Sequence, residues 1–577
     1  MPKIEVNERI FFELVGEEYN YESLEEKLPS AKAELDEWDE NSSEGSIKIE
    51  LNDTNRPDLW STSGLARLLR IHRTGRLSSG AYENFLSNKL KQQNAGTRVI
   101  KIDASLKDIR PFLTAFVISG KPIDEAMLQD IIQTQEKLCT NFGRKRKTVS
   151  MGVYRSDMIK WPVQYTAADP DNTKFIPLAT ADCDETMPEM SLREILTKHP
   201  KGKEYAGILE NFNRFPILKD IEENILSFPP IINSADIGAA KVGDTDLLVE
   251  FTGTDMDSLL LATNIVACDF ADSGYKILPV TVHHVDDTGY GMKITTPFYF
   301  QEPAFTSLDE INKLLGSEFS LTDVETALRK MDCKIELVEN KIKLYPPAYR
   351  NDFLHEVDII EDVMIGFGVE NFTPESPSDF TIGRLMKETL LSRKIKNLMT
   401  GFGFQEMIFN YLGSEKDFIE RMNVDGKNAV EILNPMSENY KVVRPSILPS
   451  LLLSEMNSAH AVYPHKIFET GKVAYLDDTE NTGTTTRQHL GFLTAMQDAN
   501  YNEAASIISG LMYYLGVDYS VKETSDPRFI QGRQANVIVD NKAIGIFGEV
   551  CPEVLENWDI TIPCFAGEID LTCLIQD

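Results

Sequence analysis

The sequence of 577 residues is long enough for several domains, and its 42% apolar and 26% charged residues are typical of a globular protein. The formal net charge of −32 excludes a chain that binds nucleic acid over most of its surface, because phosphate contacts require clustered Lys and Arg. Any contact with nucleic acid must therefore be local, or supplied by a partner.

The seven cysteines include no CxxC pair and no Cys/His spacing suited to zinc. Reduced and mostly buried thiols are expected, which indicates a reducing compartment. The N-terminus shows no basic region followed by an apolar core, and no uninterrupted apolar run is long enough to span a bilayer. The sequence therefore predicts a cytoplasmic protein without a membrane segment.

The first segment, residues 1–75, is predicted to start with a strand at Lys3–Val6 and an acidic helical stretch at about Tyr21–Trp38. The string NDTNRPD at 52–58 then predicts a turn, and apolar residues between 65 and 71 recur at near-helical spacing. A capped turn before a buried helix would explain this pattern. The following stretch 75–96, rich in Ser, Asn, Gln and Gly, is predicted to be a linker.

The next segment, residues 96–290, is predicted to form a mixed α/β domain. Its densest basic cluster is NFGRKRK at 141–147, before a strand-like TVSMGVY. This cluster is either a solvated loop or a contact to an RNA phosphate. The strings at 215–234 and 247–255 read as strands, and a core helix from about Asp257 closes the domain. No Cys–His or Ser–His–Asp constellation accompanies them, so no protein nucleophile is assigned.

A short acidic span, LYPPAYRNDFLHEVDIIEDVMIGFG at 344–368, separates two unlike halves of the chain. Helical spacing of apolar residues predicts a helix at about Glu356–Phe367, with Asp358, Glu361 and Asp362 on the side opposite to the apolar one. Asp352 joins them from the preceding segment. Four carboxylates form an oxygen-only set of the kind that binds Mg²⁺, although acidic residues at a helix start also commonly form a solvated face.

The module around this span, residues 294–371, is expected to contain two helices flanking a strand at Cys333–Val338. The first helix is predicted by an N-cap at Ser320 with an acid three residues later. The linker-like string TPESPS at 373–378 follows, and the last domain is predicted to span 378–577. Its apolar stripe between Leu391 and Phe402 predicts a helix.

The span at 344–368 resembles the metal-binding motif of the "B-five" domain of phenylalanyl-tRNA synthetase beta subunits. The resemblance implies that Asp352, Asp358, Glu361 and Asp362 bind Mg²⁺ where this subunit meets the alpha subunit. The string DTNRPDLWSTSGLARLL at 53–69 is similar to the motif that opens the same subunit.

The strings in 215–255 resemble those that line the editing pocket of this family. The resemblance implies a pocket at Leu218, Ser227, Glu250 and Thr252, with Asp255 at the end of its TGTD turn. Ser227 and Thr252 can also be ordinary buried strand hydroxyls. A carboxylate and a small hydroxyl would recognise the phenol hydroxyl of a wrongly attached tyrosine. The family's His-Asp pair is replaced here by Tyr154-Arg155.

The strings NPMSENY at 434–440, RPSILPSLL at 444–452 and PHKIFETGKV at 464–473 resemble the family's domain related to class II synthetase catalytic cores. Such a domain is an antiparallel sheet with flanking helices. A working class II site requires an arginine in a GxGxGxER string, and the sequence has none near its C-terminus. The remaining Arg444 is more simply structural. This domain is therefore expected to be catalytically silent.

The expected fold is α+β and multidomain: a mixed α/β editing domain, a small winged-helix-like metal module and a class II-like sheet. The resemblance implies a phenylalanine–tRNA ligase of two alpha and two beta chains, with ATP and phenylalanine bound by alpha, phenylalanine tRNA as substrate, and editing of tyrosyl-tRNA by this chain. The sequence shows neither the oligonucleotide-binding insertion nor the extra C-terminal anticodon domain expected of a bacterial beta subunit. This suggests the archaeal or eukaryotic cytosolic type, and the lack of an obvious eukaryotic insertion favours the archaeal one. The alternatives are a free-standing editing hydrolase, or an assembly scaffold whose pocket has decayed.

Overall fold

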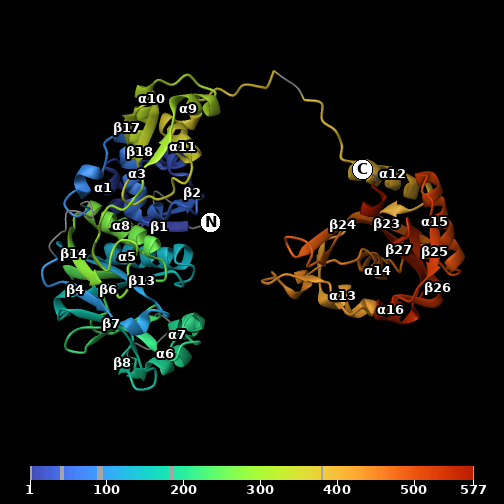
Figure 1. Cartoon of the computed structure of the whole chain (residues 1–577), viewed down its shortest axis with the longest axis horizontal. Helices are drawn as coiled ribbons and strands as arrows, with labels where there is room; N and C mark the ends of the chain where they lie inside the picture. Colours follow the sequence, from blue (N-terminus) through green and yellow to red (C-terminus); the bar gives the residue numbers. More distant parts are fainter. Residues whose placement is uncertain (1–2, 39–44, 87–94, 181–186, 379–380, 576–577) are drawn as a thin grey trace. The chain divides into compact units, whose positions relative to one another are not determined.

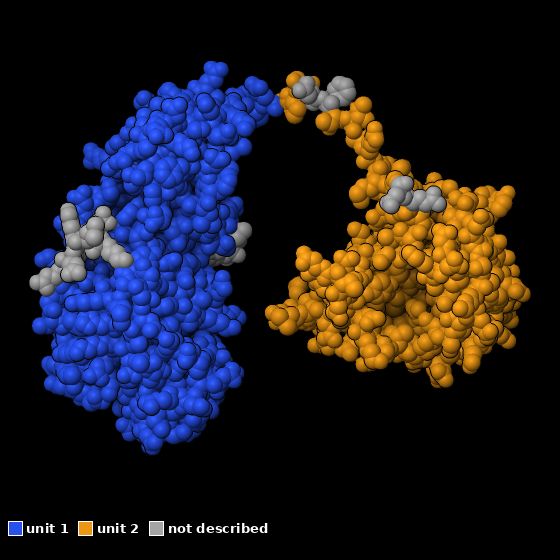
Figure 2. All heavy atoms as spheres, in the orientation of Figure 1, with its two compact units in different colours: residues 1–375 blue, residues 376–577 orange. Residues whose placement is uncertain are grey.

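The computed structural model describes residues 3–38, 45–86, 95–180, 187–378 and 381–575. They form two compact units, unit 1 (Met1–Glu375) and unit 2 (Ser376–Asp577), shown in Figures 1 and 2. The division lies two residues before the predicted start of the last domain. The boundaries predicted inside unit 1 remain predictions. Helices and separate sheets occur in both units, as expected of an α+β protein.

Unit 1 begins with a three-stranded antiparallel sheet in the order β1 (Lys3–Asn7), β3 (Ser46–Leu51), β2 (Ala33–Trp38). The helix predicted to reach Trp38 ends much earlier, because α2 spans Tyr21–Lys27 only. Pairing with β3 overrides the helix propensity of AELDEW in β2. Its acids Asp36 and Glu37 pair with Lys3 of β1 and with Lys48 of β3. The other helices here are α1 (Glu8–Val15), α3 (Thr62–Thr74) and α4 (Ser79–Tyr82).

The predicted linker at 75–96 is packed in its described part. Tyr82 and Phe85 are 3% and 4% exposed, and the backbone N–H of Ser78 donates to Asp332 over 2.7 Å. Aromatic burial therefore overrides the polar composition of residues 75–86. The rest of the predicted linker, 87–94, lies outside the described residues.

The middle of unit 1 is one large mixed sheet with strand order β12-β11-β10-β7-β4-β14-β5-β13-β6, and β15 pairs with β14. Helices α5 and α8 pack on its β6, β5 and β13 part (Figure 1). The predicted helix from Asp257 is confirmed as α8. The bounds are β4 (Val99–Ile102), β5 (Phe112–Ser119), α5 (Glu125–Lys137), β6 (Val149–Arg155), β7 (Val163–Ala168), β10 (Phe215–Lys219), β11 (Ile225–Phe228), β12 (Ile232–Asn233), β13 (Asp246–Gly253), α8 (Met256–Asp272), β14 (Lys276–His283) and β15 (Lys293–Thr296).

A small helical module with a three-stranded sheet follows, in the order β16-β18-β17. The predicted helix at 356–367 is confirmed at the same residues as α11, and the Ser320 cap with Asp323 is confirmed as a capping box. Gly366 lets α11 approach α10 closely, because a Cβ there would lie 2.1 Å from the Ala327 carbonyl oxygen. The bounds are β16 (Ala304–Thr306), α9 (Leu308–Leu315), α10 (Leu321–Lys330), β17 (Lys334–Val338), β18 (Lys341–Tyr345) and α11 (Glu356–Phe367).

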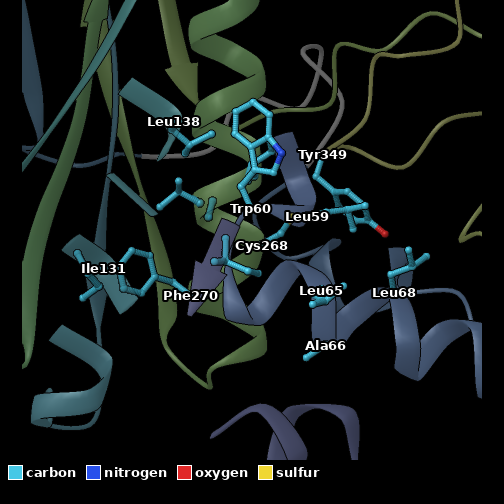
Figure 3. Close-up of a cluster of buried hydrophobic side chains, with 14 of the residues drawn as sticks. Leu59, Trp60, Leu65, Ala66, Leu68, Ile131, Leu138, Cys268, Phe270 and Tyr349 are labelled. Carbon is cyan, nitrogen blue, oxygen red and sulfur yellow. The ribbon is translucent and has the colours of Figure 1, made fainter. Parts of the chain in front are cut away.

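One hydrophobic core joins these parts of unit 1. Trp60 and Leu65 from the N-terminal segment pack in the same cluster as Leu138, Cys268 and Tyr349 (Figure 3). The residues predicted as three domains therefore share buried surface, which fixes the acidic span of the small module against the N-terminal motif.

Unit 2 is built on a seven-stranded sheet, β19-β23-β24-β28-β27-β26-β25, in which every pair except β19–β23 is antiparallel. Helices α12 and α15 cover part of it, as expected of a class II-like domain. The bounds are α12 (Lys387–Gly401), β19 (Gln405–Glu406), α14 (Leu448–Asn457), β23 (His465–Leu476), β24 (Thr484–Ala495), α15 (Tyr501–Leu515), β25 (Ser520–Glu523), β26 (Phe529–Val539), β27 (Lys542–Val550), α16 (Pro552–Asn557) and β28 (Cys564–Asp570). Within the described ranges, no helix combines the length and apolar character needed to cross a membrane.

Candidate functional site

Strand β13 carries Glu250 and Thr252, two of the predicted pocket residues. Glu250 pairs with Gly152 of β6 and Ala115 of β5, so it lies in the centre of three antiparallel strands. Because side chains alternate along a strand, Glu250 and Thr252 share one face. Both are buried, at 2% and 0% exposure.

The predicted residues Leu218 and Ser227 meet Glu250 across a buried cluster. Leu218 pairs directly with Ser227, and both side chains are at most 1% exposed. The link to Glu250 is Tyr154, whose hydroxyl lies 2.8 Å from Ser227 Oγ and 2.7 Å from Glu250 Oε1. The structure thus brings together four of the five residues that the sequence assigned to this pocket.

The Glu250 carboxyl is in an unusual electrostatic position. Burial raises its pKa to about 7, against the opposing effects of the Tyr154 hydrogen bond and the Arg110 charge. Its second oxygen, Oε2, has no hydrogen-bond partner among the described residues. A buried polar atom of this kind is costly in a closed protein and is available to a bound ligand.

Arg110 is a site residue that sequence reasoning missed. Its guanidinium is 1% exposed and donates to Thr252 Oγ1 and Ser150 Oγ, both over 3.0 Å, and to the Lys147 carbonyl over 3.1 Å. Burial lowers its pKa. A lone arginine before an apolar strand gives no sequence signal, and only the sheet register brings it to Thr252. In the sequence, Tyr154 stands out only as a departure from the family pattern.

Asp255 does not belong to this cluster, contrary to the expectation from the TGTD string. It is exposed and caps α8, accepting a hydrogen bond of 2.9 Å from the Ser258 backbone. The chain direction reverses after Gly253, so the carboxylate leaves the buried face. It borders a separate cleft of 1230 Å³, lined also by Lys3, Thr54, Trp60, Lys137, Asn141, Phe142, Arg144, Thr148 and Ser258.

The basic cluster at 141–147 divides into two roles. Arg144 borders the cleft just described, whereas Arg146 turns inward and donates to the carbonyls of Pro230 and Ile231 over 3.0 and 2.9 Å. The guanidinium of Arg146 also lies 4.3 Å from the centre of the Tyr205 ring. Arg146 therefore supports the loop after the Ser227 strand, and only the remaining basic residues can reach a phosphate.

The four acids of the span 344–368 are close in sequence but have different partners. Arg350 donates to Asp352 Oδ2 over 2.7 Å and to Asp362 Oδ2 over 2.6 Å. Asp358 accepts hydrogen bonds of 2.7 Å from the backbone of Leu354 and His355. Glu361 pairs with Lys32 of the N-terminal segment over 2.8 Å.

This arrangement corrects the expected single acidic face. Asp362 is 3% exposed and faces Arg350, whereas Glu361 is exposed. Carboxylates suit Mg²⁺ chemically, but the Arg350 guanidinium stands where a cation would have to bind Asp352 and Asp362 together. Across the described ranges, no group of three or more His, Cys, Asp or Glu side chains could hold a metal ion. The four residues as arranged therefore do not fit Mg²⁺.

The two sequence motifs of unit 1 meet at this charge cluster. Arg56 of the NDTNRPD string forms two hydrogen bonds of 2.8 Å with Asp58, and both residues are buried. Lys32, which pairs with Glu361, also lies 2.6 Å from Asp53 of the same string. The capped turn expected from the sequence is thus part of an ion-pair network that binds the small module to the N-terminal segment.

Arg444 of unit 2 is structural, as the missing class II string suggested. Its guanidinium is 0% exposed and donates to both oxygens of Glu469 over 2.7 and 2.9 Å and to the Lys472 carbonyl over 2.8 Å. A guanidinium with these partners has no free face for a nucleotide phosphate. Among the described residues, unit 2 therefore offers no arginine at this motif for ATP.

Two family models and several full-length relatives match this chain. The family model described as "tRNA synthetase B5 domain" matches residues 305–369, and "Phenylalanyl tRNA synthetase beta chain CLM domain" matches 373–571. The chain is 47% identical over 609 aligned residues to a phenylalanine–tRNA ligase beta subunit of Treponema pallidum subsp. pallidum. It is 46% identical over 579 residues to that of Borreliella burgdorferi, and each match covers 100% of both chains.

A solved structure shares the fold of part of the chain. The crystal structure of an N-terminal fragment of the phenylalanyl-tRNA synthetase beta subunit from Pyrococcus horikoshii aligns with a TM-score of 0.57 and 35% identity. The alignment covers 64% of this chain and 100% of the fragment.

The expected archaeal source is not supported, because the two relatives just named, which align with this chain over the full length of both chains, are bacterial. The features on which that expectation depended do not separate archaeal from bacterial chains, because these two bacterial relatives align end to end with this chain. Because identity near one half extends over the full length of both chains, this chain belongs to the phenylalanine–tRNA ligase beta subunit family of aminoacyl-tRNA synthetases.

Proposed function

We propose that this chain supports attachment of phenylalanine to its tRNA by a separate alpha subunit, in a cytoplasmic assembly of two alpha and two beta chains. ATP and phenylalanine would bind to the alpha subunit. The observation that carries this proposal is the closed Arg444–Glu469 pair, which leaves the class II-like sheet of unit 2 without its nucleotide arginine at that motif. The free thiols of the six described cysteines agree with a reducing compartment.

The test is aminoacylation of phenylalanine tRNA by this chain alone, by the alpha chain of the same genome, and by the two together. Activity only in the mixture is the expected result. Activity of the isolated chain would contradict the proposal, because unit 2 would then contain a working site.

The second part of the proposal is hydrolysis of tyrosyl-tRNA in the cluster around Glu250. A pocket for phenylalanine cannot strongly reject a side chain that only adds a hydroxyl, so a second, hydrolytic site supplies the missing discrimination. The Glu250 carboxylate would accept the hydrogen bond of the tyrosine phenol, and Arg110 would hold Thr252 beside it.

Water is the proposed nucleophile. Ser227 has only the Tyr154 hydroxyl as its side-chain hydrogen-bond partner in the described chain, so no base activates it. The water oxygen would add to the tyrosyl carbonyl carbon, and the bond to the terminal ribose oxygen would break. The ribose oxygen takes the proton, and the products are tyrosine and uncharged tRNA.

Glu250→Ala tests this part. In the assembly with alpha, the substitution should abolish hydrolysis of added tyrosyl-tRNA, whereas Asp246→Asn, a carboxylate change at the start of the same strand, should not. Equal hydrolysis by Glu250→Ala and the unsubstituted chain would contradict the proposal.

A further inference from the structure

The side chain of Tyr154 lies along its own strand rather than across the sheet. A Cβ added at Gly152 would lie 2.1 Å from the Tyr154 hydroxyl and 2.6 Å from Glu250 Oε1. Gly152 is therefore the space through which the phenol reaches Glu250, which pairs with Gly152 on the neighbouring strand. The whole side chain is buried, at 0% exposure.

The partners of this phenol are those proposed for a bound tyrosine. Its hydroxyl is within hydrogen-bond distance of Ser227 Oγ and Glu250 Oε1, the small hydroxyl and the carboxylate of the pocket. A hydroxyl has one proton, so it can donate to the Glu250 oxygen and accept from Ser227. A tyrosine of the substrate would need the same two contacts.

We propose that Tyr154 is a built-in occupant of the phenol subsite, so that tyrosine attached to tRNA must displace this side chain before it can bind Glu250. The inference rests on the proposed editing function for its biological meaning. It makes Tyr154 a specificity-determining residue that lowers the apparent affinity of the pocket for tyrosine.

The size of this effect follows from the fraction of molecules with an open subsite. If Tyr154 fills the subsite nine-tenths of the time, the apparent affinity for tyrosine falls about tenfold, because only the open fraction binds. The same occupant would also exclude water and free phenols from the carboxylate.

A matched control exists in the same cluster. Tyr165 is also fully buried, but its hydroxyl lies beside Thr252 and makes no hydrogen bond with Glu250 among the described residues. Tyr165→Ala therefore removes a ring of the same size without removing a hydrogen bond to Glu250.

The first experiment measures binding of 4-methylphenol, a tyrosine side-chain probe, to the full chain in complex with alpha. Tyr154→Ala should bind the probe about tenfold more tightly than the unsubstituted chain, and addition of Glu250→Gln should reverse the gain. Tyr165→Ala should not show this Glu250-dependent gain. Equal binding by Tyr154→Ala and the unsubstituted chain, with both folded by circular dichroism, would overturn the inference.

Tyr154→Phe keeps the ring in place and covers the case in which the alanine variant does not fold. Its ring should still block the probe, so binding should stay as weak as in the unsubstituted chain. If Tyr154→Phe bound the probe as tightly as an open subsite should, about tenfold more tightly than the unsubstituted chain, the inference would be overturned, because the ring would then lie outside the subsite.

The second experiment separates the inference from the editing function. Hydrolysis of tyrosyl-tRNA by the assembly should rise about tenfold in Tyr154→Ala if the pocket edits. Probe binding without hydrolysis would support the occupied subsite and refute editing, leaving an assembly scaffold. The unsubstituted assembly could instead hydrolyse tyrosyl-tRNA quickly and lose this activity in Tyr154→Ala. That result would support editing and overturn the inference, because Tyr154 would then assist the reaction.

Discussion

Arg350 Nη1 lies 2.6 Å from Asp362 Oδ2, and the two side chains are only 2% and 4% exposed. The same guanidinium also binds Asp352, so one cation serves two buried carboxylates. Arg56 adds a second buried guanidinium to the cluster, where its charge acts on Asp352 and Asp362. The acidic motif is thus neutralised by residues of the chain itself.

Arg350→Met should destabilise unit 1 strongly. Removal of one partner of a buried ion pair leaves uncompensated charge, which costs about 3–5 kcal/mol. Urea unfolding of the full chain, followed by tryptophan fluorescence, measures the loss mainly in unit 1, which contains Trp38, Trp60 and Trp161 of the four tryptophans.

The control for this change is Glu361→Gln. Glu361 and Lys32 are 46% and 26% exposed, so their pair should contribute about 1 kcal/mol or less. Equal destabilisation by both variants would show that Arg350 is not the centre of the network.

Mg²⁺ should not stabilise the isolated chain through the four acids. Because Arg350 already neutralises Asp352 and Asp362, the melting temperature in millimolar Mg²⁺ should equal that in EDTA at matched ionic strength. Stabilisation by Mg²⁺ that disappears in Asp358→Asn/Glu361→Gln would restore the sequence-based metal hypothesis, and would mean that Arg350 moves aside for the ion.

The sequence predicted α11 to the residue, because its apolar spacing, its cap and Gly368 all agree. The sequence could not predict that Asp362 turns inward. Helical spacing shows which acids lie near one another on α11, but it does not show that the buried Arg350 pairs with Asp362. Likewise the local pattern predicts a helix where β2 forms, because the partner strand β3 lies further along the chain. Pairing between distant segments is not visible in local patterns.

The same limit applies to the candidate pocket. Ser227, Glu250 and Thr252 were assigned from their strings, and the sheet does bring them together with Leu218. Arg110 and the inward phenol of Tyr154 were not foreseen, because their roles depend on which strands pair. The resemblance placed Asp255 at the end of the TGTD turn, and in the structure this residue is the exposed N-cap of α8, outside the buried cluster.

The stability of unit 1 should depend on pH through Glu250. Burial raises the pKa of this carboxyl from 4.5 to about 7, so the folded chain binds the proton more tightly than the unfolded chain. Its contribution to stability is therefore complete below pH 4.5 and is lost as the pH rises through about 7.

Glu250→Gln should remove this dependence, because the amide does not ionise. Between pH 4.5 and 8 the free energy of unfolding should shift in favour of the variant by about 3 kcal/mol relative to the unsubstituted chain. Urea unfolding at several pH values measures this difference. A constant difference across that range would show that the carboxyl titrates normally, and hence that it contacts water.

Gly152→Ala should disturb the site without removing any of its polar groups. The new methyl group would overlap the Tyr154 hydroxyl at 2.1 Å and Glu250 Oε1 at 2.6 Å, so the phenol must leave its place. Overpacking of this kind costs about 1–3 kcal/mol, which a melt of the full chain would detect. In Gly152→Ala/Tyr154→Phe the ring lacks the overlapping hydroxyl, so part of the lost stability should return. No recovery in the double variant would place the conflict at Glu250 Oε1 or at the ring carbon of residue 154, each 2.6 Å from the new methyl group, rather than at the Tyr154 hydroxyl.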